Sequence, residues 1–357
     1  MKLTIEDLCQ HLSLDFAGNG DTVITHVCGI DKLSTNPGGL AFITNPNDLA
    51  DLPTPKGVFS EQATKIDTIV APEDSAIIVP KSASSEHHNL IFSDDPLDAH
   101  VQAIAILYPP IAITHLIHPA AVIDDDSKIG KNTSIDANVT IYQNVTIGEN
   151  TVIRAGVVIM PNSKIGDNCI IYPNVSIREN CTIGNNVIIH SNTEIGSDGF
   201  GFYQRSGINK KIPQIGGVII EDNVELGGGC TIDRARFYNT VIKKGSKLDN
   251  MVHIAHNVIV GENALIAAQS GIAGSTITGS NLIMGGQSGI KDNMQVGNQV
   301  TIFGRSVVTS NTGDNEVIAG FPSKPMKKWR KIQALLNSLE SIVKRLKTLE
   351  KKVNKDA

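Results

Sequence analysis

Isoleucine recurs at every sixth residue through the middle of the chain, and this period constrains the fold more than any other feature. Fourteen consecutive positions at this spacing, from Ile117 to Ile195, are all isoleucine. A small residue, such as Ala121 or Ser127, stands four residues after each of the first thirteen. A helix, with about 3.6 residues per turn, and a strand, with about two, would both lose this phase.

A six-residue period of this kind predicts a β-helix. The aliphatic side chain fills the interior of a triangular prism, and three hexapeptides make one coil of 18 residues. Successive coils stack at the spacing of β-strands, about 4.8 Å. The pattern stops after Ile195, resumes from Ile220 to Ile232, and after four extra residues runs from Ile242 to Val308. The 29 hexapeptides would form nearly ten coils.

Residues 1–107 lack the six-residue period, and we expect them to form a small α/β domain. Thr4 and Asp7 have the spacing of a capping box that opens a short helix. Short apolar runs that end in Pro or polar turns predict strands, and the last apolar stretch predicts a helix. The expected strands lie at 68–70, 76–79 and 90–92, and the expected helix at 99–107.

We therefore expect a mainly β protein with the β-helix at residues 108–320 and a helical extension at 321–357. Residues 197–217 are polar and rich in glycine, which predicts a loop that leaves the β-helix. In the extension, apolar residues spaced three and four apart from Ile332 to Val353 predict three heptads of a coiled-coil seam. Three heptads are marginal alone, so we expect self-association around a trimer of β-helices.

The C-terminal extension is also basic. Residues 326–357 carry ten Lys and Arg and three acids, a local charge of +7, whereas the whole chain has a net charge of −5. A solvated helix face is one interpretation of this tail, and a docking surface for an acidic partner is the other.

Composition excludes several classes of protein. The net charge of −5 argues against a general nucleic-acid binder, and no apolar stretch approaches the length of a membrane span. The five cysteines include no CxxC pair, which argues against a disulfide framework or a zinc ribbon. Cys169, Cys181 and Cys230 fall at the small inward position and are expected to fill the core. We expect a cytoplasmic protein with at most peripheral membrane contact.

A β-helix is a scaffold, so any chemistry must come from residues that point outward. His253 and His256 flank the inward Ile254 and are expected to point out together, with Asp249 close enough in the chain to orient one of them. Eighteen residues after His256 stands Gly274, where the missing Cβ would let a substrate approach the backbone N–H. An imidazole base beside an exposed backbone donor is the minimal set for acyl transfer, although a surface histidine pair is often inert.

Zinc binding is the competing chemistry for clustered histidines. The positions one coil after His253 and His256 are Gly271 and Gly274, so no third histidine is expected there. No P-loop or nucleophile elbow is present either. We therefore expect neither a metal ion nor a cofactor.

The chain resembles the UDP-3-O-(3-hydroxyacyl)glucosamine N-acyltransferases of lipid A biosynthesis over essentially its whole length. The resemblance combines the hexapeptide repeat with several short segments. These segments are Gly39–Pro46, Asp198–Phe202, Lys211–Gly216, Thr231–Arg234, Ile254–Asn257 and Trp329–Arg330. It implies a left-handed β-helix and a homotrimer with active sites in the clefts between subunits.

The resemblance also implies roles for individual residues. His256 would be the general base that deprotonates the 2-amino group of UDP-3-O-acyl-glucosamine, which attacks the thioester of a 3-hydroxyacyl-acyl carrier protein. Gly274 would donate the oxyanion hydrogen bond, and Asp249 and Asn250 would orient the base. The basic C-terminal helix would help to dock the acidic carrier protein.

In the N-terminal domain, Phe42 and Asn45 match family residues that hold the uridine. Asp48 stands near the place where many members carry a tyrosine that stacks on uracil, and Asn293 where some carry a histidine. His253, which we assign to the substrate-binding set, gives the site a likeness to the UDP-N-acetylglucosamine O-acyltransferases of the same pathway. That O-acyltransferase and a non-catalytic binding solenoid are the alternative functions.

Overall fold

The computed structural model describes residues 2–44, 73–83, 89–109, 116–320 and 325–353. The chain divides into two compact units, Met1–Ala112 and Ile113–Ala357. The strand expected at 68–70 lies outside the described residues.

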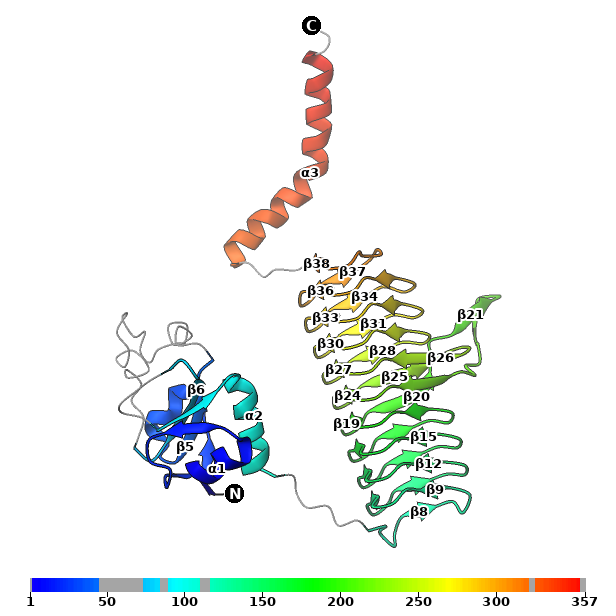
Figure 1. Cartoon of the computed structure of the whole chain (residues 1–357). Coiled ribbons are helices and arrows are strands. Elements are labelled where there is room, and N and C mark those ends of the chain that lie inside the picture. The colour runs from blue at the N-terminus through cyan, green and yellow to red at the C-terminus, as the bar shows by residue number, and fades with distance from the viewer. Residues whose placement is uncertain (1, 45–72, 84–88, 110–115, 321–324, 354–357) are drawn as a thin grey trace. The chain divides into compact units, whose positions relative to one another are not determined.

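The first unit is a small α/β domain, as predicted (Figure 1). Its sheet has the strand order β2-β7-β6-β5-β4, in which only the β2–β7 pair is antiparallel. The two α-helices bury apolar side chains such as Leu8 and Ala103 against sheet residues such as Ile78. The elements are β1 (Leu3–Thr4), α1 (Ile5–Leu12), β2 (Asp15–Ala17), β3 (Val23–Ile24), β4 (His26–Val27), the 3₁₀ helix η1 (Ile30–Thr35), β5 (Gly39–Phe42), β6 (Ala76–Pro80), β7 (Asn89–Ser93) and α2 (Pro96–Leu107).

Both helices of this unit begin at side-chain caps. Thr4 Oγ1 accepts a hydrogen bond from the Asp7 N–H at 3.1 Å, which confirms the predicted start of α1. The helix α2 begins three residues earlier than expected, because Asp95 accepts from the Asp98 N–H at 3.0 Å and Pro96 fits the first turn.

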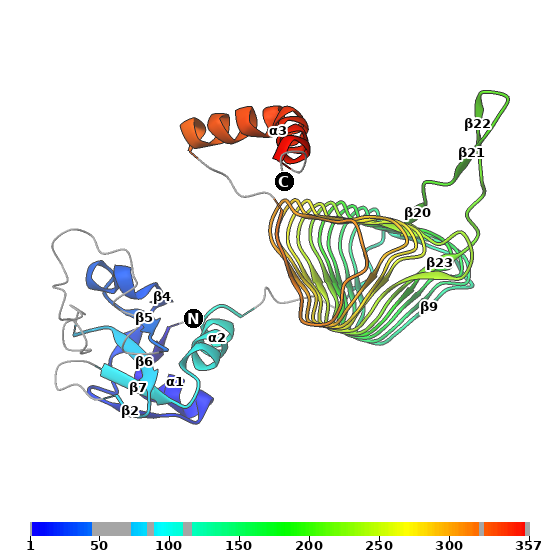
Figure 2. The same cartoon turned by 90° about the horizontal axis from the view of Figure 1, so that it is seen from above.

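The second unit contains the predicted left-handed parallel β-helix. Three parallel sheets form the walls of the prism, and regular coils repeat every 18 residues, as in the pairing of Thr140 with Val158 (Figure 2). Sheet I contains β10 (Ser134–Ile135), β13 (Val152–Ile153), β16 (Ile170–Ile171), β19 (Ile188–Ile189), β24 (Glu225–Leu226), β27 (Lys247–Leu248), β30 (Leu265–Ile266), β33 (Ile283–Met284), β36 (Thr301–Ile302) and β38 (Val317–Ile318).

The other two walls carry the same short strands. Sheet II contains β8 (Val122–Ile123), β11 (Thr140–Ile141), β14 (Val158–Ile159), β17 (Ser176–Ile177), β20 (Glu194–Asp198), β25 (Thr231–Arg234), β28 (His253–Ile254), β31 (Gly271–Ile272), β34 (Gly289–Ile290) and β37 (Val307–Val308). Sheet III contains β9 (Lys128–Ile129), β12 (Thr146–Ile147), β15 (Lys164–Ile165), β18 (Thr182–Ile183), β23 (Gly217–Ile220), β26 (Asn239–Ile242), β29 (Ile259–Val260), β32 (Ile277–Thr278) and β35 (Gln295–Val296).

The repeated isoleucines form one continuous core along the prism. From Ile135 to Ile195 they are almost fully buried, whereas Ile117, in the first coil, is 50% exposed. Thr278, the one departure from aliphatic character in the last run of the repeat, is also buried, and its hydroxyl accepts a hydrogen bond from the Gly261 N–H at 2.9 Å. This hydrogen bond satisfies the polar group inside an apolar core.

A second position of the repeat, which the sequence analysis did not use, shapes the corners. In most coils the third residue after the inward aliphatic residue has φ near +60°, and most of these residues are asparagine. Asparagine tolerates this left-handed conformation better than most residues. Its side chains also stack: Asn144 Nδ2 donates to Asn162 Oδ1 at 2.9 Å, and Asn162 Nδ2 donates to Asn180 Oδ1 at 3.3 Å.

The predicted loop at 197–217 does leave the β-helix, and it contains an antiparallel hairpin (Figure 2). The hairpin strands β21 (Phe202–Arg205) and β22 (Ile208–Lys211) are exposed along their whole length. At this level the prism strands are longer than elsewhere, because β20 continues to Asp198 and pairs with an extended β25.

The predicted C-terminal helix is α3 (Met326–Val353). Its apolar seam is exposed, with Leu335, Leu339 and Leu346 each more than half exposed. Self-association through this seam stays a prediction. Within the part of the chain that the structure describes, no helix combines the length and apolar character needed to cross a membrane.

Candidate active site

The two candidate histidines lie together on sheet II, as expected. Ile254, between them, is fully buried, while the His253 side chain is 49% exposed and His256 is half-buried. Both line a cavity of about 540 Å³, which we call the histidine pocket, together with Gly274 and Asp233. His253 points outward because it alternates with the inward Ile254 on β28, whereas His256 lies in the turn after this strand and lines the pocket from there.

Gly274 lies against the His256 ring one coil later. The register pairs Ile254 with Ile272, so His256 is aligned with Gly274, and the N–H of Ser275 donates to the His256 carbonyl at 2.9 Å. A Cβ on Gly274 would lie 2.7 Å from Cε1 and 2.8 Å from Nε2 of His256. Among the backbone hydrogen bonds of the described residues, none uses the Gly274 N–H, so this donor is available to a ligand.

Asn257 fixes the orientation and tautomer of His256. Asn257 Nδ2 donates to the Phe237 carbonyl at 3.0 Å and Oδ1 accepts from the Arg236 N–H at 3.0 Å, so the amide has one orientation. Oδ1 also lies 3.2 Å from His256 Nδ1. An amide oxygen can only accept, so Nδ1 carries the proton and Nε2, which faces Gly274, keeps its lone pair.

The ejected segment supplies part of the pocket wall, a role that the sequence analysis left open. Gly199 packs against His256, where a Cβ would lie 2.4 Å from the His256 Cβ and 2.9 Å from its Cδ2. Phe200 lines the pocket. The ejected segment therefore contacts the candidate base at the point where it leaves the β-helix.

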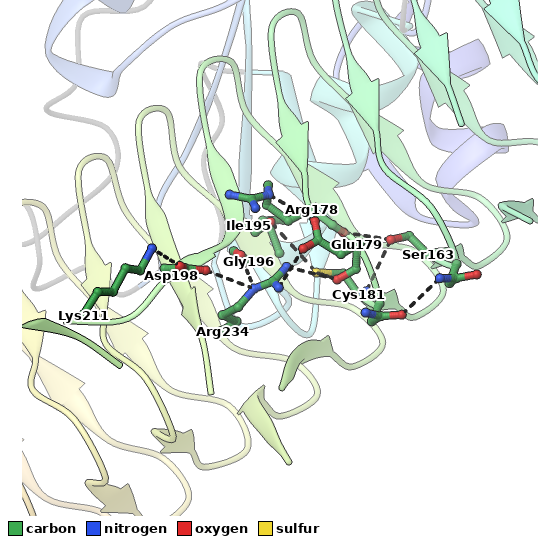
Figure 3. Close-up of polar contacts among 11 residues, drawn as sticks. Ser163, Arg178, Glu179, Cys181, Ile195, Gly196, Asp198, Lys211 and Arg234 are labelled. Atoms are coloured by element: carbon green, nitrogen blue, oxygen red, sulfur yellow. Dashed lines mark hydrogen bonds and ion pairs between the residues drawn. The ribbon is translucent and has the colours of Figure 1, made fainter. Parts of the chain in front are cut away.

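A buried arginine anchors the base of the ejected segment (Figure 3). Arg234, with a side chain 5% exposed, donates through Nε to the Gly196 carbonyl at 2.7 Å and through Nη1 to Glu179 at 2.8 Å. Burial raises the pKa of the Glu179 carboxyl, but hydrogen bonds from its own backbone and from Arg234 and Arg178 outweigh burial, and the pKa is lowered. Asp198 pairs with Lys211 at the foot of the hairpin.

The expectation that Asp249 orients a histidine of its own chain is wrong. Its carboxylate accepts hydrogen bonds from the backbone N–H groups of Asn250 at 2.7 Å and Ala268 at 3.1 Å. Asp249 and Asn250 follow β27 of sheet I, and a corner of the prism separates them from His253. They line a second groove of about 870 Å³, shared with His190, Glu225 and Met284.

Comparison with known proteins decides the family. A family described as bacterial transferase hexapeptide (six repeats) matches residues 126–161, 162–197 and 239–274. The chain is 50% identical over 329 residues to UDP-3-O-acylglucosamine N-acyltransferase of Methylacidiphilum infernorum, covering 92% of this chain and 89% of that protein. It is 45% identical over 353 residues to the protein of that name from Geobacter sp. strain M21, covering 99% and 97%. The chain belongs to the UDP-3-O-acylglucosamine N-acyltransferase family.

Membership of the N-acyltransferase family confirms the resemblance drawn from the sequence and shows that the protein is an enzyme. Solved structures also match. They include an Arabidopsis UDP-N-acetylglucosamine acyltransferase (TM-score 0.46, 23% identity, 57% of this chain and 71% of that chain). Another is UDP-N-acetylglucosamine O-acyltransferase of Moraxella catarrhalis (TM-score 0.42, 27% identity, 55% and 68%).

The other residues expected to act in this N-acyltransferase are placed as follows. Phe42 ends β5 and its ring lies 4.5 Å from that of His100, while Asn45 lies outside the described residues. His253 Nδ1 is hydrogen-bonded to Thr231 Oγ1 at 2.8 Å. Asn293 also lines the histidine pocket.

The three cysteines of the repeat are core residues, as predicted. Cys169, Cys181 and Cys230 are fully buried. Burial raises the pKa of the Cys181 and Cys230 thiols to about 11, and it also raises that of Cys169. A thiol in this state is a poor nucleophile.

Proposed function

We propose that this enzyme transfers a 3-hydroxyacyl chain from acyl carrier protein to the 2-amino group of UDP-3-O-acyl-glucosamine. The observation that carries the proposal is the contact of the His256 ring with the backbone of Gly274, in a chain 50% identical to a protein of that name. This contact puts a base and an oxyanion donor at one point of a cavity.

The chemistry follows from the hydrogen bonds of His256. Its free Nε2 removes a proton from the sugar amine, whose nitrogen attacks the thioester carbonyl carbon. The negative charge that develops on the carbonyl oxygen is stabilised by the Gly274 N–H. The C–S bond then breaks, His256 returns its proton to the leaving sulfur, and the products are the amide and the carrier thiol.

A homotrimer would complete the site. Asp249 and Asn250 line a groove on a different wall from His256, so they can serve the reaction only across an interface between chains. With active sites in the clefts between subunits, the groove of one chain would face the histidine pocket of its neighbour. His253 would contact the substrate from the same pocket as His256.

The first unit and the C-terminal helix would recognise the two substrates. We assign Phe42 and Asn45 to the uridine of the UDP-sugar. The helix α3 (residues 326–353) carries nine Lys and Arg residues and two Glu residues. This positive charge suits an acidic carrier protein. A carrier-bound donor also agrees with action in the cytoplasm.

The deciding experiment assays the purified protein with 3-hydroxyacyl-carrier protein and each of two acceptors, UDP-3-O-acyl-glucosamine and UDP-N-acetylglucosamine. We expect acylation of the amine only, and loss of about 10³-fold or more in rate for His256→Ala, as for removal of a general base. The control is His118→Ala, an exposed histidine outside the pocket. Activity on UDP-N-acetylglucosamine alone would establish the O-acyltransferase instead, and an active His256→Ala protein would disprove the assignment of the base.

A further inference from the structure

The histidine pocket contains a buried carboxylate that the mechanism above does not use. Asp233 is 8% exposed and lines the pocket. Its Oδ2 lies 3.7 Å from Nε2 of His253, and its Oδ1 accepts a hydrogen bond from Ser197 Oγ at 3.1 Å. A carboxylate is rarely buried unless a partner of opposite charge compensates for the lost hydration.

The fold places Asp233 there through a local departure from the regular coil. Strand β25 continues two residues past Ile232 and pairs with β20, where the register shifts between Ile195 and Ser197. An irregularity of this kind changes the direction of the side chains that follow. Asp233 lines the pocket, while Arg234, the next residue, is held by the Gly196 carbonyl and Glu179 (Figure 3).

The charges around Asp233 favour a cation in this pocket. Burial raises the pKa of the Asp233 carboxyl, while His253, the Ser197 hydroxyl and His256 act in the opposite direction. Glu194, on β20, adds a second negative charge nearby, and Asp292 lines the same pocket. When His256 takes a proton from the amine, the pocket gains one positive charge, and Asp233 and Asp292, which line the same pocket, carry the opposite charge.

We propose that Asp233 is a positioning residue for acyl transfer, which holds His253 through its Nε2 edge and compensates for the positive charge that His256 gains in the transition state. Thr231 Oγ1 holds the opposite nitrogen of His253, so the ring is fixed between the two side chains of one strand. Asp233 also interacts electrostatically with His256 itself, so its charge acts on both rings of the pocket. This role rests on the proposed function of His256.

The test combines a pH–rate profile with a titration that needs no substrate. In the full-length protein, we expect Asp233→Asn to reduce kcat/KM at pH 7 by about tenfold and to move the acid limb of the profile to lower pH by about one unit. The NMR titrations of the His253 and His256 Cε1–H signals, assigned with single His→Gln variants, should shift in the same direction. Asp233→Glu keeps the charge and should restore the acid limb, even where its rate is lower.

Two further variants separate charge from structure. Asp198→Asn removes a carboxylate from the paired strand outside the pocket and should leave both the acid limb and the histidine titrations unchanged. Asp233→Ser is a second neutral variant for the case in which Asn disturbs folding. Histidine titrations that are identical in wild type and in the folded neutral variant would overturn the proposal. A wild-type protein without transferase activity would overturn the proposed function instead, while the titrations would still test the Asp233–histidine coupling.

Discussion

The backbone of Gly274 lies against the imidazole of His256, one coil later in the β-helix, and leaves no room for a side chain. A Cβ at Gly274 would come within 2.7 Å of the ring. The same glycine thus brings its N–H to the proposed reacting centre and lets His256 keep its position.

We therefore expect Gly274→Ala to lower kcat by roughly a hundredfold, because a ring displaced by about 1 Å loses its alignment with the substrate. The measurement is the steady-state rate of acyl transfer, with the melting temperature as a check on folding. Gly289→Ala is the matched control, since the nearest atom to its new Cβ is 3.9 Å away. A Gly274→Ala protein with wild-type kcat would show that the contact has no catalytic role.

The six-residue period made the β-helix predictable, because each coil contacts only its neighbours and the phase survives along the prism. It also placed Gly274 beside His256, since both lie in the regular part of the repeat. The expectation for Asp249 rested on closeness in the chain and not on the period. That residue is close to His253 in the chain, but Met251 turns the corner between them with φ of 58°.

Asp233 was missed for a related reason. It directly follows the inward Ile232, so the phase of the repeat turns its side chain outward, but the four extra residues before Ile242 obscure which groups it would meet. Its environment depends on the pairing of β25 with β20 and on Ser197, at the base of the ejected loop. The corner position of Asn257 could have been predicted, because the repeated asparagines mark the left-handed corners. Its hydrogen bond to His256 could not, because the repeat does not specify the direction of the amide side chain.

The asparagine corners should contribute measurably to stability. Asn162 has φ of 62°, a left-handed conformation that costs most L-residues, including alanine, about 1–2 kcal/mol and that asparagine tolerates through its short polar side chain. Asn162→Ala introduces this strain. Asn162→Gly loses the same side-chain hydrogen bonds without that strain, but it gains entropy in the unfolded chain. We expect the Ala variant to be less stable than the Gly variant by about 0.5–1 kcal/mol in urea unfolding. An Ala variant of equal or greater stability would contradict this account of the corners.

The buried pair of Arg234 and Glu179 should make stability depend on pH. The folded-state pKa of Glu179 is lowered from 4.5, so the pair stabilises the fold above that value, and the contribution is lost as pH falls through the lowered pKa. At pH 7 we expect Arg234→Met to cost about 1–3 kcal/mol, because it removes the buried partner of a partly buried carboxylate and leaves only the more exposed Arg178 beside it.

Thermal unfolding from pH 7 to pH 3 checks this expectation. The difference between wild type and Arg234→Met should shrink as Glu179 is protonated, although the hydrogen bond to the Gly196 carbonyl persists. Arg178→Met is the control, since Arg178 contacts the same carboxylate at 3.2 Å with its side chain 32% exposed. We expect a cost below about 1 kcal/mol for that exposed pair. A deficit of Arg234→Met that stays constant with pH would contradict the role of the ion pair.

Docking of the acyl donor should depend on the charge of α3. Dissolved salt screens the attraction between exposed charges. The rate of acyl transfer from the carrier protein should therefore fall as salt rises toward about 0.5 M, where the Debye length is about 4 Å. The double variant K344Q/R345Q should raise KM for the carrier-bound donor by about two- to twentyfold at low salt, at unchanged kcat. K128Q/K131Q removes two equally exposed charges from the β-helix and should leave KM unchanged. A carrier KM that does not respond to salt or to K344Q/R345Q would remove α3 from the docking surface.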